Sequence, residues 1–102
     1  MNIKIDGVAS EHFSKPNSMA SLILNQINNG MYDKFIPLFN NGTVLDLGGN
    51  IGLFSIFASQ TASKVFSVEP TRSHQEVFNH LIKSNDVKNI TLLPLAIFSS
   101  NG

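Results

Sequence analysis

A short apolar run that ends in a cluster of glycines constrains this chain more than any other stretch. Residues 44–52 read VLDLGGNIG, with Asp46 set inside the apolar run and glycines at positions 48, 49 and 52. A helical apolar pattern follows from Ile51. This order predicts a buried strand, a tight turn and a helix start, where backbone N–H groups and the positive end of the helix dipole converge. We therefore expect a ligand site at this turn.

The other elements follow the same strand and helix alternation. Residues 1–16 suit an arm or an edge strand, and Pro94 favours an edge position for the last strand. Strand, helix, strand, helix, strand with short connections predicts an α/β fold with a parallel sheet. The expected elements are a helix from Ser18 with apolar Met19, Leu22, Ile23 and Ile27, a short helix in 31–39, a strand at 44–47, a helix at 51–61, a strand at 64–69, a helix opened by a capping box at Ser73 and Glu76, and a strand at 90–97.

Composition limits the classes of function. The 102 residues, 42% of them hydrophobic, suit one globular domain. Seven Lys and Arg balance seven Asp and Glu without a basic block, so neither a nucleic-acid patch nor an anionic-membrane patch is expected. Because the chain has no cysteine, disulfides and thiolate metal sites are excluded. The polar start and the short apolar runs favour a cytoplasmic protein.

An acid at the end of the second strand adds a second signal. Glu69 lies 17 residues after Gly52, and an acid at this place in nucleotide-binding α/β folds accepts hydrogen bonds from ribose hydroxyls. The dinucleotide fingerprint G-x-G-x-x-G fails, because the third position from Gly48 is Asn50 and the sixth is Leu53. No Walker loop occurs. A glycine loop D-x-G-x-N-x-G without a phosphate cradle remains, which disfavours an oxidoreductase.

Three stretches together resemble one enzyme family. LDLGGNIGLFSIFA, VFSVEPTRSHQEVFNHL and ITLLPLAIFSSNG look like the first half of an S-adenosylmethionine-dependent methyltransferase of the FkbM type, over residues 30–102. The resemblance implies a Rossmann-like parallel sheet of the class I methyltransferase type, truncated after the third strand. It also implies an N-terminal arm and helical segment at 1–42 and a partial cofactor-binding domain at 43–102.

The resemblance also implies a cofactor site for S-adenosylmethionine. Glu69 would hold the ribose hydroxyls, Pro70 and Thr71 would lie beside the adenosine, and Ala96 and Ile97 would flank the adenine. The loop residues that would line the methionine end are Asp46, Gly48, Gly49, Asn50 and Gly52.

Each of these assignments has a plainer alternative. Asp46 would equally well order the loop, Asn50 would cap the following helix, and Glu69 would be a solvated acid at a strand end. Tyr32, Phe35 and Phe39 suit the core better than a cofactor site. The three histidines, His12, His74 and His80, share no metal-ligand spacing, and His80 is expected to pair with Glu76 on a helix surface. We assign no metal and no catalytic residue.

The resemblance finally suggests what the chain does. The family implies methyl transfer, and we expect a small-molecule or glycan hydroxyl as acceptor and no nucleic-acid or membrane partner. The family's acidic motif on a fourth strand falls beyond Gly102, so we expect this chain alone to be an inactive cofactor-binding half. Its first strand would keep a bare edge that could support self-association. The alternative function is a non-catalytic Rossmann-like binding or interaction module.

Overall fold

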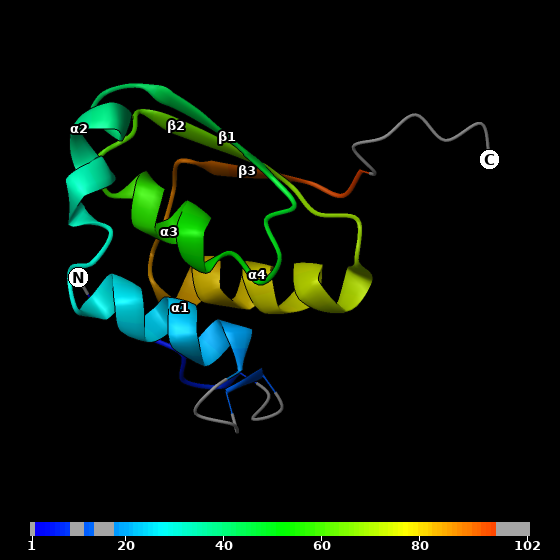
Figure 1. Ribbon diagram of the computed structural model, residues 1–102. Helices are drawn as coiled ribbons and strands as arrows, with labels where there is room; N and C mark the ends of the chain where they lie inside the picture. Colours follow the sequence, from blue (N-terminus) through cyan, green and yellow to red (C-terminus); the bar gives the residue numbers. More distant parts are fainter. Residues whose placement is uncertain (1, 9–11, 14–17, 96–102) are drawn as a thin grey trace.

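The structure is an α/β arrangement in which one parallel sheet lies over a set of helices (Figure 1). This computed structural model describes residues 2–8, 12–13 and 18–95. The expected α/β fold with a parallel sheet is confirmed. In chain order the elements are α1 (Met19–Asn28), the 3-10 turn η2 (Asp33–Phe35), α2 (Ile36–Phe39), β1 (Thr43–Leu47), α3 (Leu53–Ser59), β2 (Lys64–Val68), α4 (Arg72–Ser84) and β3 (Ile90–Leu93).

The sheet has the strand order β1-β2-β3, and both strand pairs are parallel. Val44 is in register with Val65, and Val65 is in register with Ile90. β3 ends at Leu93, before Pro94, and lies at an edge of the described sheet, as the proline predicted. The expected extension of this strand to residue 97 does not occur as far as the described chain reaches.

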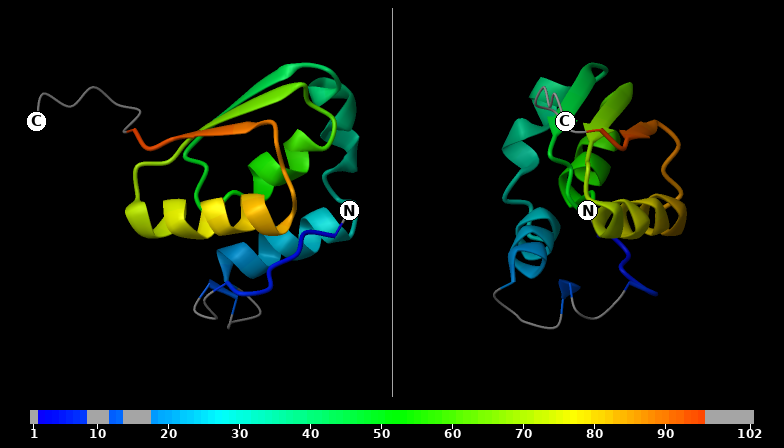
Figure 2. Two further views of the ribbon diagram at one scale, coloured as in Figure 1. Left: turned by 180° about the vertical axis from the view of Figure 1, so that it is seen from behind. Right: turned by 90° about the vertical axis from the view of Figure 1, so that its right-hand side faces the viewer.

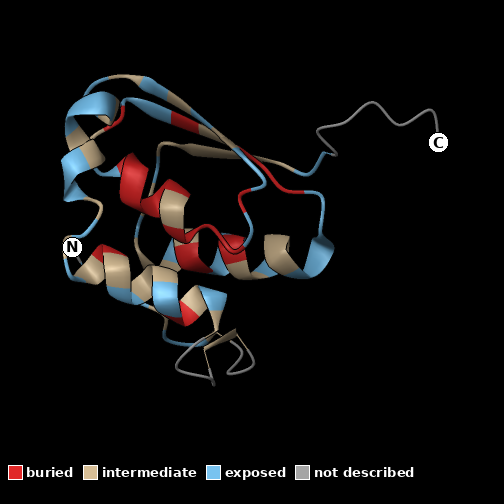
Figure 3. Ribbon diagram, viewed as in Figure 1, coloured by how far each residue is buried: buried red, intermediate tan, exposed pale blue. Residues whose placement is uncertain are grey.

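Two apolar clusters hold the helices to the sheet. The first joins Val65 of β2 to Ala58 of α3 and to Ala62 in the turn after α3. The second lies among the helices, where Ile27, Ile56 and Leu81 are fully buried. Burial of one such side chain stabilises a fold by about 1.5–3 kcal/mol, and the second cluster also includes Ile51 and Leu53, which flank Gly52, so it anchors the glycine loop. Figure 3 shows α3 as the most continuously buried helix.

The described helices α1, α3 and α4 lie on the same side of the sheet (Figure 2). The opposite face carries Leu45 and Leu47, which are 62% and 56% exposed. β1 occupies the other edge of the described sheet, so the expected bare edge of the first strand is present in the described residues. No helix of the described residues is long and apolar enough to cross a bilayer.

Helix α1 starts where the sequence predicted. The Ser18 hydroxyl accepts a hydrogen bond from the Ser21 N–H at 3.2 Å and caps the helix. Ile27 is fully buried as expected, but Met19 is 68% and Leu22 43% exposed. The predicted apolar face was therefore wrong at two of its four positions, because only the side of α1 that faces α3 is covered. In the next segment Pro37 falls in the first turn of α2, where proline is tolerated.

Helix α4 does not begin with the predicted capping box. Its N-cap is Thr71, without a side-chain cap, and Ser73 lies inside the helix. The helix start is instead fixed from outside: the Glu69 carboxylate accepts the Thr71 N–H at 2.9 Å, and the Gln75 amide donates to the Glu69 carbonyl at 2.8 Å. The Glu69 carboxylate thus satisfies the N–H of the N-cap residue, the group that the Glu of a capping box would bind.

The first residues form an arm rather than an edge strand. The Asn85 side chain accepts the Lys4 N–H at 2.8 Å and donates to the Lys4 carbonyl at 2.9 Å, in the manner of a strand partner. Ile3 is buried in the same cluster as Ile27 and Leu81. The arm is thereby fixed against α4 and the end of α1.

Candidate functional site

The glycine loop crosses from β1 to α3 over the end of β2. The N–H groups of Gly48 and Gly49 both donate to the Val68 carbonyl at 2.9 Å, and the Gly52 N–H donates to Gly49 at 3.0 Å. Gly48 and Gly52 have φ angles of +76° and +96°. Asn50 also has a positive φ, +55°, and its side chain is exposed. The loop therefore presents its backbone, rather than bulky side chains, at the carboxyl ends of the strands.

Two glycines of the loop have no room for a side chain. A Cβ on Gly52 would overlap the ring of Phe78, which is fully buried. A Cβ on Gly49 would overlap the Ser67 hydroxyl and lie 3.0 Å from Phe78 Cε2. By contrast, nothing lies within 4 Å of a Cβ built on Gly48. Gly49 and Gly52 are thus required by close packing of the loop on β2 and α4, in addition to backbone conformation at Gly52.

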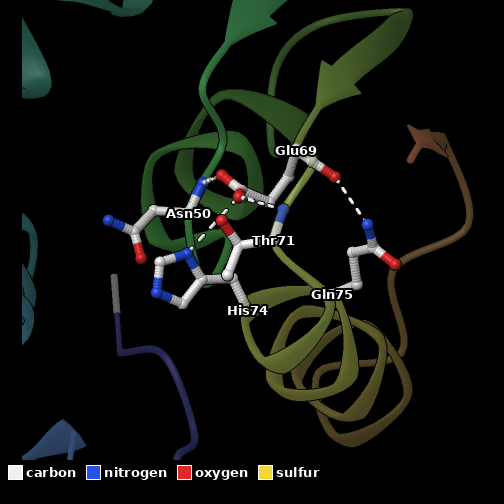
Figure 4. Close-up of polar contacts among 5 residues, drawn as sticks. All are labelled: Asn50, Glu69, Thr71, His74 and Gln75. Atoms are coloured by element: carbon white, nitrogen blue, oxygen red, sulfur yellow. Dashed lines mark hydrogen bonds and ion pairs between the residues drawn. The ribbon is translucent and has the colours of Figure 1, made fainter. Parts of the chain in front are cut away.

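Glu69 is the centre of the polar contacts at this loop (Figure 4). It follows β2 directly and is only 5% exposed. Oε1 accepts the Asn50 N–H at 2.6 Å, and Oε2 accepts the Thr71 N–H at 2.9 Å. The His74 Nδ1 lies 3.4 Å from the same Oε2. One carboxylate therefore joins the glycine loop to the start of α4.

The environment of Glu69 favours its ionised form. Burial raises the pKa of the Glu69 carboxyl, but the hydrogen bonds from the Thr71 and Asn50 N–H groups act against it. Together with the Thr71 hydroxyl and the His74 ring they outweigh burial, so the pKa of Glu69 is lowered. A buried, ionised acceptor beside an exposed loop backbone is suited to binding hydroxyl groups.

A pocket opens on the other side of the same loop. Its volume is about 360 Å³, and it lies between the loop and the start of α1. The loop contributes residues 48–52, β1 contributes Asp46, and α3 contributes Phe54. The N-terminal side contributes His12, Ser18, Met19, Ala20 and Ile23. This volume lies within the range of about 300–1,000 Å³ that is usual for small-molecule sites.

The structure brings most of the predicted site residues together. Asp46 and the four loop residues Gly48, Gly49, Asn50 and Gly52 all line the pocket. The Asp46 carboxylate also accepts a hydrogen bond from the Ser55 hydroxyl at 2.6 Å, so it connects β1 to α3. Pro70 and Thr71 are exposed beside Glu69. Ala96 and Ile97 lie outside the described residues.

Two plainer alternatives from the sequence are wrong. Asn50 does not cap α3, because the N-cap is Gly52 and the Asn50 N–H binds Glu69. Glu69 is not a solvated strand-end acid, because it is buried and holds the loop. The expected core role of Tyr32 is confirmed: its ring packs against Phe54 and Phe57, and its hydroxyl donates to Gln26 at 2.6 Å.

The histidines differ from their expected roles. His80 does not pair with Glu76; its Nε2 lies 2.7 Å from the Asp6 carbonyl, and Glu76 pairs with Arg72 at 3.6 Å. His74 contacts Glu69, and its place in the first turn after a strand-end acid was a signal for this contact. His12 lines the pocket although it lies 34 residues before Asp46, so no local spacing could have identified it.

The fold is that of known methyltransferases. No protein-family profile matches the chain, and no curated protein matches it. Among solved structures, Arabidopsis thaliana protein arginine methyltransferase 10 is 25% identical over 70% of this chain and 21% of that chain, with a TM-score of 0.59. The Trypanosoma brucei PRMT1 enzyme-prozyme complex with AdoHcy is 24% identical over 76% of this chain and 24% of that chain, with a TM-score of 0.62.

Other neighbours correct the expected partners. An rRNA methylase from Streptococcus thermophilus is 11% identical over 63% of this chain and 39% of that chain, with a TM-score of 0.56. Because proteins with this fold methylate RNA or protein arginine, the expectation of a small-molecule or glycan acceptor and of no nucleic acid is wrong. The balanced charge of residues 1–102 could not support that exclusion, because these residues match only about a fifth to two fifths of the length of such chains.

The comparisons also bear on the cofactor and on the extent of the match. The expected cofactor is the one that neighbours hold: the Trypanosoma brucei complex contains AdoHcy, and an M. jannaschii protein was solved with AdoMet. The chain spans about a fifth to two fifths of the length of the solved chains it matches. Its described part has the Rossmann-like fold of class I S-adenosylmethionine-dependent methyltransferases.

Proposed function

We propose that this chain is the S-adenosylmethionine-binding part of a methyltransferase of the FkbM type. The observation that carries the proposal is the buried Glu69 carboxylate, which is held against the glycine loop and next to a pocket of small-molecule size. The motif D-x-G-x-N-x-G at residues 46–52 and the Glu-Pro pair at 69–70 support the FkbM type. S-Adenosylmethionine, when bound, would supply the methyl group of its sulfonium: an acceptor bonds to the methyl carbon and S-adenosylhomocysteine leaves.

Glu69 has the capacity to accept the ribose hydroxyls. An ionised carboxylate offers about four lone-pair positions, and Glu69 receives three described contacts, from two N–H donors and one ring nitrogen, as well as the Thr71 hydroxyl. The contact to His74, at 3.4 Å, is the longest of the three. A ribose hydroxyl would therefore bind by displacing the weakest of these partners, the His74 ring, from Oε2. The two backbone donors keep the carboxylate in place as this happens.

The pocket on the α1 side suits the methionine end. It shares Asn50 with the Glu69 network, so a ligand that spans both would cross the backbone of the loop. The amino acid part of the cofactor carries an ammonium and a carboxylate, and Asp46 provides a negative group for the ammonium. Pro70 and Thr71, exposed on the far side of Glu69, would then lie beside the adenosine.

Binding and methyl transfer are separate properties of this chain. Methyl transfer needs an acceptor held in line with the sulfonium, and this alignment depends on precise positioning groups. In the described residues the sheet has one uncovered face and β1 has no second partner strand. We therefore propose that residues 1–102 bind the cofactor without transferring its methyl group.

Isothermal titration with S-adenosylhomocysteine tests the proposal. The wild-type chain should bind, and Glu69→Gln should weaken binding by about 10–100-fold, because a hydrogen bond to a charged group contributes about 1.5–3 kcal/mol. The matched control is Glu76→Gln, since Glu76 is an exposed glutamate on α4 away from the loop. Its binding should equal that of the wild type.

Two results would contradict the proposal. Absence of binding to a folded wild-type chain would remove the cofactor assignment and favour the non-catalytic module. Equal affinities for wild type and Glu69→Gln would show that the ribose does not contact Glu69. Circular dichroism of each variant separates these results from unfolding, because Glu69 also holds the Asn50 and Thr71 backbones.

A further inference from the structure

We infer that His12 binds the carboxylate of the cofactor's amino acid end, opposite Asp46, so that the pocket is built for a zwitterion. The inference rests on the proposed function, because it assigns a second charged contact within the same site. Neither the glycine motif nor the family resemblance covers His12, which lies before residue 30.

The ionisable groups of the pocket point to this assignment. Of the described residues that line it, only Asp46 and His12 have ionisable side chains. The rest are the loop residues 48–52, Ser18, and the apolar side chains of Met19, Ala20, Ile23, Leu53 and Phe54. An α-amino acid brings one ammonium and one carboxylate. The pocket thus offers one partner of suitable chemistry to each.

The segment that carries His12 is attached to α1. The Ser18 hydroxyl donates to the His12 carbonyl at 3.1 Å, and the Ser21 hydroxyl donates to the Phe13 carbonyl at 3.4 Å. Ser18 at the same time caps α1 by accepting the Ser21 N–H. The start of a regular helix therefore fixes the backbone of His12 at the pocket. A neutral or a protonated imidazole can donate an N–H to a carboxylate.

The Asp46 carboxylate is oriented to accept a hydrogen bond from the ligand's ammonium group. Its Oδ2 is occupied by the Ser55 hydroxyl at 2.6 Å, which orients the carboxylate between β1 and α3. A carboxylate so held keeps lone pairs for a further donor. The ammonium of the ligand is such a donor, and His12 on the N-terminal side would then meet the ligand carboxylate. Asp46 and His12 reach the pocket from β1 and from the segment before α1.

Two ligands that differ only in the carboxylate test the inference. S-Adenosylmethionine carries the group and decarboxylated S-adenosylmethionine lacks it, while both keep the ammonium and the adenosine. His12→Ala should weaken binding of S-adenosylmethionine by about tenfold or more and leave the affinity for the decarboxylated ligand unchanged. Asp46→Asn should weaken binding of both ligands. His80→Gln is the matched histidine control, because His80 lies on α4 against Asp6.

The outcomes separate this inference from the proposed function. If the wild type binds both ligands and Glu69→Gln weakens both, but His12→Ala weakens neither or both equally, the proposed function holds and the His12 assignment is overturned. If the folded wild type binds neither ligand, both are overturned. Should His12→Ala fail to fold, His12→Leu, which keeps bulk without a donor, must show the same selective loss.

Discussion

Replacing Gly52 with alanine tests why the loop after β1 requires glycine. Gly52 has a φ of +96°, and a Cβ there would lie 2.7 Å from Phe78 Cγ and closer to the adjacent ring carbons. A left-handed backbone costs an ordinary residue about 1–2 kcal/mol. Overpacking against a fully buried ring adds about 1–3 kcal/mol. Gly52→Ala should therefore lower the free energy of unfolding by about 2–5 kcal/mol, a large part of the usual 5–15 kcal/mol or so.

Gly48→Ala is the matched control for backbone conformation. Gly48 has a similar φ of +76°, but nothing lies within 4 Å of its Cβ position. Its substitution should cost only the backbone term, about 1–2 kcal/mol. Urea denaturation followed by circular dichroism measures both variants. Phe78→Leu, introduced into the Gly52→Ala protein, should cost less than it does in the wild type, because the smaller side chain relieves the overlap.

Equal losses of stability in the two glycine variants would contradict a role for Phe78. So would an equal cost of Phe78→Leu in the Gly52→Ala background and in the wild type. Either result would mean that the Phe78 ring moves away without loss, so that the loop is not limited by its packing on α4.

Three further predictions concern the supports of the site. Acid should destabilise the wild type more than Glu69→Gln. The folded state lowers the pKa of Glu69, so the stability that this gives is complete above the usual pKa of glutamate and is lost as pH falls through the pKa of folded Glu69. Urea midpoints of the two proteins that change in parallel with pH would contradict this. Ser18→Ala should lower the free energy of unfolding by about 1 kcal/mol because Ser18 caps α1, whereas Ser73→Ala, inside α4, should lower it by less than about 0.5 kcal/mol. Equal urea midpoints for the two variants would mean that Ser73 also caps its helix. Asn89→Ala should cost about 1–3 kcal/mol, because its amide donates to the Ser59 and Ala62 carbonyls at 2.9 and 3.0 Å; an unchanged thermal midpoint would show that water replaces both bonds.

The sheet and the glycine loop could be predicted because their signals are local. The apolar run before the glycines predicted a strand at 44–47, and β1 begins one residue earlier. The run from Lys64 predicted a strand at 64–69, and β2 ends one residue earlier, at Val68. The glycines predict a turn from their residue type alone, without knowledge of the side chains that pack against it. What the pattern could not show is the reason for Gly49, which depends on Ser67 and Phe78 from other elements.

The predicted start of α4 was wrong because the carboxylate of Glu69, just before the helix, binds the N–H of its N-cap residue. Ser73 and Glu76 have the spacing of a capping box, and in an isolated helix this would be favourable. In the folded chain Glu69 binds the Thr71 N–H, so the helix begins at Arg72. Only the position of Glu69 at the end of β2 makes this contact available. The capping-box pattern was overridden by another local hydrogen bond, which spans two residues and comes from the residue that follows β2.

Only the half of the candidate site that Glu69 and the glycine loop form could be predicted from the sequence. Glu69 and the loop follow from spacing, since both lie at the carboxyl ends of neighbouring parallel strands. The other half, on the side of α1, depends on how residues before the sheet pack against it. The Ser18 hydroxyl holds the His12 carbonyl and the Ser21 hydroxyl holds the Phe13 carbonyl, so a helix start fixes His12 at the pocket, which no periodicity in residues 1–16 indicates.

The most direct test of the central claim is a two-dimensional amide NMR spectrum of the labelled chain with and without S-adenosylhomocysteine. If Glu69 and the glycine loop form the cofactor site, dispersed amide signals should shift at Gly48–Gly52, Glu69 and Thr71. Those of Lys64 and Val65, at the opposite end of β2 from Glu69, should change little. A dispersed spectrum that the ligand leaves unchanged, or shifts confined to residues far from the loop, would contradict the claim.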